Sequence, residues 1–177
     1  MTLDPAVVAE WQRWTGRSES TNEVLDPGAL RRFAAVIGED TDVERHWPSL
    51  GHWGCFLPVV RAEEVGFDGH PLRGGFLPPV TLPRRMFATA EMHFAAPLRV
   101  GEPATRRAMI RDIRHRMGES GALLLIDVEY VITQAGVDCV MERQTIVYRG
   151  ENGRTPAMVL SSVDGPCAAR GKIGLMI

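Results

Sequence analysis

Apolar residues recur at helical spacing in two segments near the N-terminus, residues 5–15 and 27–37. Both begin with an aspartate able to cap a helix and a proline suited to the first turn, and both end at a glycine. In the second segment the apolar positions are spaced i, i+3, i+4 and i+7, which is typical of an amphipathic helix. We expect its Phe33 and Ile37 to be buried against a sheet.

The helical period disappears between residues 39 and 85, where proline and glycine are frequent. Both residues weaken regular structure, so irregular backbone is predicted here. The same stretch carries many apolar residues, including Trp47, Trp53 and Phe56. We therefore expect an ordered loop that packs over a core or a partner subunit.

After residue 85 the pattern changes to alternation of apolar and polar residues, which is typical of strands. Strands are predicted over residues 86–94, 104–117, 123–132 and 139–148, joined by glycine-containing turns. Strands linked by such turns form an antiparallel meander. Residues 150–177 show no period, and we expect an irregular C-terminal tail.

Composition and charge restrict the function. The 177 residues suit one domain, and the formal net charge of -2 gives no general attraction to nucleic acid or to an anionic membrane. The arginine-rich segment 106–116 is interpreted as a solvated sheet edge, with nucleic-acid binding as the alternative. Three widely spaced cysteines favour a reducing compartment and offer no metal site. With no pattern for a signal peptide or membrane span, a cytoplasmic protein without metal or cofactor is expected.

Several local sequences resemble one group of hydratases of the MaoC type, the fatty-acid-synthase-like dehydratases. These are WGCFLP at 53–58, DGHPLRGGFLPP at 68–79, LPRRM at 82–86, FAAPLRVG at 94–101 and QTIVYR at 144–149. The group includes mesaconyl-CoA hydratases and type 2 hydroxyacyl-thioester dehydratases, and the resemblance covers roughly residues 14–149.

The resemblance implies an α+β fold, a single hot-dog domain over residues 1–149 in which a curved antiparallel sheet wraps around a central helix. It implies a hydro-lyase acting on an acyl-CoA or acyl-carrier-protein thioester. The family pairs two hot dogs around a thioester tunnel, and this chain resembles only the first. A homodimer, or a heterodimer with a second hot-dog chain, is therefore expected, with Trp47, Trp53 and Phe56 near the interface.

Three residues are candidate catalysts for hydration, which needs a proton acceptor and a proton donor. MaoC enzymes usually carry Gly-Asp-x-Asn-Pro-x-His after a helix, and residues 38–46 here read GEDTDVERH, without Asn-Pro and with the histidine one place late. Asp40 or Asp42 with His46 is one candidate pair, and a solvated helix end is the alternative. His52, beside an aromatic residue, is the other candidate, or it satisfies a loop hydrogen bond.

The substrate-binding candidates are aromatic and cationic. Aromatic side chains can line an acyl pocket, and guanidinium groups suit the phosphates of CoA or of a carrier-protein arm. For the arginines, ion pairs that anchor the loop are the alternative. The candidates are Trp53, Phe56, Phe76, Arg73, Arg84 and Arg85.

Three functions remain open at this stage. The chain is an acyl-thioester hydratase or dehydratase, a non-catalytic hot-dog subunit that shapes the acyl tunnel for a separate catalytic half, or a hot dog with thioester-binding or thioesterase-like chemistry. The sequence does not define the acyl group or the direction of the reaction.

Overall fold

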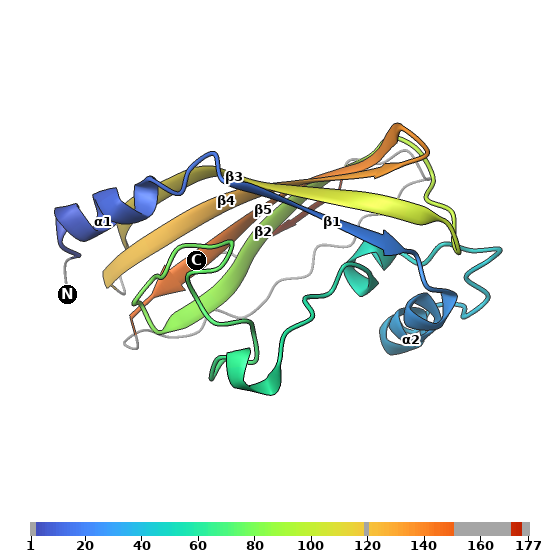
Figure 1. Cartoon of the computed structure of the whole chain (residues 1–177), viewed down its shortest axis with the longest axis horizontal. Coiled ribbons are helices and arrows are strands. Elements are labelled where there is room, and N and C mark those ends of the chain that lie inside the picture. Colours follow the sequence, from blue (N-terminus) through green and yellow to red (C-terminus); the bar gives the residue numbers. More distant parts are fainter. Residues whose placement is uncertain (1–2, 119–120, 151–170, 175–177) are drawn as a thin grey trace.

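The fold is built on one antiparallel sheet. The computed structural model describes residues 3–118, 121–150 and 171–174. Within them the strand order is β1-β3-β4-β5-β2-β6, and every neighbouring pair is antiparallel (Figure 1). The strands are β1 (Ser18–Val24), β2 (Arg84–Phe94), β3 (Pro103–Gly118), β4 (Gly121–Gln134), β5 (Val137–Arg149) and β6 (Gly171–Gly174).

The four strands predicted from alternation are confirmed as β2 to β5. Their side chains alternate as expected: Ala88, Ala90 and Met92 of β2 are all buried. The sheet also contains β1, which the sequence did not predict because its seven residues, SESTNEV, are almost entirely polar. β1 pairs with β3 along its whole length. The prediction that segment 106–116 forms a sheet edge holds for only part of the segment. β1 pairs with residues 103–109 of β3, whereas residues 111–116 have no strand partner on that side within the described part of the chain.

The two predicted helices are confirmed as α1 (Pro5–Gln12) and α2 (Pro27–Ile37). The side chain of Asp26 accepts hydrogen bonds from two backbone N–H groups in the first turn of α2. Gly38 ends the helix with a φ of 77°, the left-handed conformation that glycine adopts without strain. Among the described residues, no helix is long and apolar enough to cross a bilayer.

Helix α2 packs over one end of the sheet through only part of the predicted apolar stripe. Leu30 and Ala34 are fully buried, together with Ile132 and Val140 of the sheet. Ile37 is 42% exposed, so its predicted burial is wrong. Phe33 is half-buried and lies against Gly54 rather than the sheet, because the short helix η1 (Gly51–Gly54) packs beside α2.

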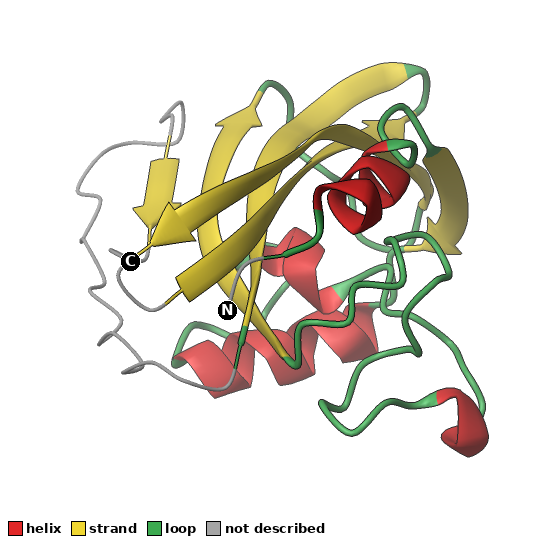
Figure 2. Cartoon of the chain, turned by 90° about the vertical axis from the view of Figure 1, so that its left-hand side faces the viewer, coloured by secondary structure: helices red, strands yellow, loops and turns green. Residues whose placement is uncertain are grey.

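One face of the sheet carries two apolar clusters. The first cluster includes Leu30 and Ala34 of α2. The second includes Trp11 of α1 together with Val80 and Leu82. The sheet curves over these helices and loops (Figure 2). Burial of this face is the main source of stability expected for a domain of this kind.

The last described strand, β6, lies within the segment for which irregular structure was predicted. It pairs with residues 89–92 of β2 and thereby extends the sheet beyond the predicted meander. The rest of that predicted tail, residues 151–170 and 175–177, lies outside the described part of the chain.

Candidate functional site

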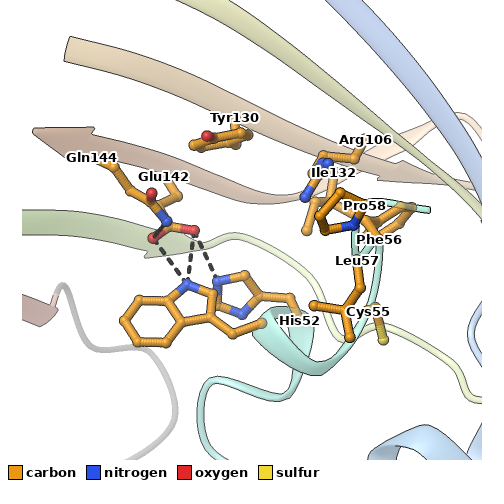
Figure 3. A pocket seen from close by; sticks show the side chains of 11 residues that line it. His52, Cys55, Phe56, Leu57, Pro58, Arg106, Tyr130, Ile132, Glu142 and Gln144 are labelled. Carbon is orange, nitrogen blue, oxygen red and sulfur yellow. Dashed lines mark hydrogen bonds and ion pairs between the residues drawn. The ribbon is translucent and has the colours of Figure 1, made fainter. Parts of the chain in front are cut away.

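A cavity of about 310 Å³ lies between the sheet and the segment that follows η1 (Figure 3). Its volume is at the lower end of the range for small-molecule sites, and its lining combines apolar and aromatic side chains with several polar and charged ones. The residues that line it are His52, Trp53, Cys55, Phe56, Leu57, Pro58, Arg106, Tyr130, Ile132, Glu142 and Gln144.

Close backbone packing fixes the loop side of this cavity. A Cβ added at Gly51 would lie 2.9 Å from the indole nitrogen of Trp47, and one added at Gly54 would lie 3.0 Å from the Cβ of Phe33. Beyond η1, the backbone N–H of Phe56 donates to the carboxylate of Glu23 at 2.6 Å, which ties the loop to β1. Only glycine fits the first two positions without displacing a neighbour.

On the sheet side, the carboxylate of Glu142 in β5 contacts nitrogen atoms of three side chains. Its carboxylate lies 3.0 Å from Nε2 of His52, accepts from Nε1 of Trp53 at 3.0 and 3.1 Å, and accepts from Nε2 of Gln144 at 2.8 Å (Figure 3). The side chains of His52 and Glu142 are 2% and 3% exposed. Nδ1 of His52 is buried and has no hydrogen-bond partner among the described residues. The pair is thus a buried imidazole–carboxylate unit in the cavity wall.

Arg106 and Tyr130 form the opposite part of the lining, on the neighbouring strands β3 and β4. The Arg106 guanidinium lies over the rings of Phe56 and Tyr130, at 5.4 Å from each centroid. Burial raises the pKa of Tyr130 to about 12, so its hydroxyl stays protonated and can donate a hydrogen bond.

Cys55 also lines the cavity but is not suited to nucleophilic chemistry. Burial, with Glu23 and Asp26 nearby, raises the pKa of its thiol to about 12. A thiol nucleophile needs a lowered pKa, because the thiolate is the reactive form. Within the described residues, no group of three or more metal-ligating side chains is present.

The structure separates the two candidate catalytic sites of the sequence. His52 lies in the cavity wall, together with the binding candidates Trp53 and Phe56. Asp40 and His46 form a pair with 4.0 Å between Oδ2 and Nδ1, but their side chains are 65% and 68% exposed and line no part of this cavity. That exposure matches the alternative of a solvated helix end.

The other binding candidates do not line this cavity either. Phe76 packs with the second apolar cluster. Arg73 donates to the carbonyls of Val80, Leu82 and Pro83, so it anchors the loop before β2.

Arg84 and Arg85 line a separate cavity of about 460 Å³ with Phe67 and Asp68 among its walls. Nε of Arg85 lies 3.6 Å from the Asp68 carboxylate, whereas Arg84 is exposed and has no ion-pair partner among the described residues. Arg84 is therefore the better placed of the two to meet a phosphate in solvent.

Sequence reasoning missed the polar residues that the strands bring to the cavity: Arg106, Tyr130, Glu142 and Gln144. The sequence did contain a signal for Glu142 and Gln144. In β5 the even-numbered positions from 140 to 148 share one face, and Glu142 and Gln144 interrupt an otherwise apolar series. Polar residues at inward positions need partners, which marks them as functional or as part of a network.

Comparisons with known proteins agree on one family. The sequence model of the family described as hydroxyacyl-thioester dehydratase type 2 matches residues 47–165. Mesaconyl-C(4)-CoA hydratase from Chloroflexus aurantiacus is 40% identical over 152 residues, which cover 84% of this chain and 54% of that protein. The chain thus spans about half the length of this relative.

A solved structure of similar shape supports the fold. A chain of the ChsH1–ChsH2 complex from Mycobacterium tuberculosis superposes with a TM-score of 0.53 at 14% identity, covering 89% of this chain and 97% of that one. A MaoC-like dehydratase from Rhodospirillum rubrum gives a TM-score of 0.44 at 15% identity, covering 76% and 92%. With the match of the family model and the 40% identity to its relative, the chain belongs to the hydroxyacyl-thioester dehydratase type 2 family and has a hot-dog fold.

Proposed function

We propose that this chain binds an acyl thioester in the cavity beside residues 52–58 and takes part in adding water to, or removing it from, the α,β bond of that thioester. The observation that carries the proposal is the buried His52–Glu142 pair in the wall of a cavity that combines apolar and polar side chains. The relative from Chloroflexus aurantiacus, a mesaconyl-C(4)-CoA hydratase, supports the reaction class.

The pair fits the proton transfers of hydration. Water must lose a proton as its oxygen bonds to the β-carbon, and the α-carbon must gain one. With Nε2–H donated to Glu142, the unpartnered Nδ1 of His52 is the proposed acceptor of the proton from water. Because Nδ1 is buried in this structure, residues 52–58 have to shift on ligand binding to expose it. The carboxylate then stabilises the imidazolium, which returns the proton to the α-carbon. The protonated hydroxyl of Tyr130 is the proposed donor to the thioester oxygen.

A coupled hydration assay on crotonyl-CoA and mesaconyl-CoA tests the proposal, with and without a second hot-dog chain. His52→Gln removes the proton acceptor and should lower kcat by roughly 100-fold or more while changing KM little. His70→Gln is the matched control, because His70 is exposed on a loop outside the cavity. Unchanged turnover in His52→Gln would remove this histidine from the mechanism.

A second function has its own support. The chain spans 54% of its relative, and its Asp40–His46 pair, the nearest match to the MaoC motif, lies at the surface. On this alternative the chain shapes the acyl tunnel of a catalytic partner, as a homodimer or heterodimer of hot dogs. Turnover that requires the partner and survives His52→Gln would favour this function.

A further inference from the structure

The Arg106 guanidinium is a cation in the cavity without an anionic partner. Among the residues that the structure describes, no carboxylate pairs with it and no acceptor bonds it, and its Nε is buried. It is held instead between the rings of Phe56 and Tyr130. Arg106 is half-buried, and losing part of the hydration of a guanidinium without an anion is unfavourable, so the site suits a ligand that supplies one.

The cavity's own carboxylate is already engaged elsewhere. Each oxygen of Glu142 accepts two contacts, Oε1 from Trp53 and Gln144, and Oε2 from His52 and Trp53. Its acceptor positions are therefore taken up by these neighbours, and no ion pair within 4.0 Å joins it to Arg106 among the described residues. Among the described lining residues, the buried polar atoms without a partner are Nδ1 of His52 and Nε of Arg106, and only Arg106 carries a fixed positive charge.

We infer that Arg106 recognises a carboxylate carried by the acyl group, so that the preferred substrates are thioesters of short dicarboxylic acids. This inference rests on the proposed function, since it names the substrate class of the same cavity. Arginine suits a carboxylate because its planar fork donates two parallel hydrogen bonds, and the flanking rings fix its plane. The cavity volume of about 310 Å³ fits a short acyl group.

Binding of two saturated thioesters tests the inference without requiring turnover. Succinyl-CoA and butyryl-CoA share the CoA part and a four-carbon acyl chain and differ by the terminal carboxylate. We expect the chain to bind succinyl-CoA more tightly, and Arg106→Gln to weaken succinyl-CoA about tenfold or more while changing butyryl-CoA less than twofold. Arg106→Lys keeps the charge without the fork and should lose part of the preference.

Arg107→Gln is the matched control, because Arg107 is the exposed neighbour on the opposite face of β3. It should leave both dissociation constants unchanged. Equal weakening of both thioesters by Arg106→Gln would overturn the inference, because Arg106 would then serve the CoA phosphates or the thioester oxygen. Equal affinity of the unmodified chain for both ligands would overturn it as well. Binding of neither thioester would instead overturn the proposed function on which it rests.

Discussion

Replacing Glu142 tests whether the polar network of the cavity holds the loop on the sheet. Glu142→Ala removes the acceptor for His52 and Trp53 while leaving both donors in place. His52 is 4% exposed, so water cannot substitute for the lost carboxylate without rearrangement. Glu142→Gln is the milder change, because the amide keeps one acceptor oxygen but loses the charge.

The magnitude follows from the contacts. A buried donor left without a partner costs about 1–3 kcal/mol, and Glu142→Ala leaves two such donors, on His52 and Trp53. We therefore expect Glu142→Ala to lower the free energy of unfolding by about 3–5 kcal/mol. Glu142→Gln removes the charge and leaves one acceptor oxygen for the three donor side chains, which should cost about 1–3 kcal/mol.

Guanidinium chloride unfolding, followed by circular dichroism and tryptophan fluorescence, measures these differences. Glu91→Gln is the control, because Glu91 is exposed on β2, and it should stay within about 0.5 kcal/mol of the unmodified chain. Trp53→Phe should cost less in the Glu142→Ala background, where its hydrogen bond is already lost. A loss below about 1 kcal/mol for Glu142→Ala, or additive effects in the double variant, would refute the reasoning.

Three further predictions concern residues outside the proposed chemistry. Burial raises the pKa of Asp127, but its hydrogen bonds, chiefly from Arg114, outweigh this and lower it below the usual value. The stabilisation by the Asp127 carboxylate is thus full above about pH 4 and is lost as the pH falls further. The difference in unfolding free energy between Asp127→Asn and the unmodified chain, measured by urea unfolding, should therefore shrink below that pH. Cys55, with a pKa of about 12, should react with iodoacetamide at pH 8 about 1,000-fold more slowly in the folded chain than after unfolding, as measured by mass spectrometry; equal rates would contradict its burial. Arg73→Gln should lower unfolding free energy by about 2–4 kcal/mol, since it removes the hydrogen bonds to three carbonyls, whereas exposed Arg84→Gln should change it by less than about 0.5 kcal/mol; the opposite order would contradict the anchoring role.

The sequence predicted the parts of the fold that depend on local patterns. Alternation located β2 to β5, and capping residues such as Asp26 and Gly38 located the ends of α2, because these signals come from neighbouring residues. It missed β1, whose polar residues join the sheet through backbone hydrogen bonds to β3. It also misjudged Ile37, because the side on which η1 packs decides which helical stripe is covered.

The site was predictable only on its loop side. His52 and Trp53 stood out as polar and aromatic residues within an apolar loop. Glu142 comes from a strand 90 positions away from His52, and its role depends on the sheet register that brings β5 under the loop. Arg106 was grouped with its basic neighbours, although alternation along β3 places Arg107 on the other face.

A crystal structure of the chain with bound butyryl-CoA, which cannot be hydrated, tests the central claim most directly. The account predicts the acyl carbons in the cavity lined by Trp53, Leu57 and Tyr130, with the thioester carbonyl within reach of the Tyr130 hydroxyl and the β-carbon facing His52. An acyl group seated elsewhere, for example in the cavity beside Phe67 and Met86, with the cavity at His52 left empty, would contradict it.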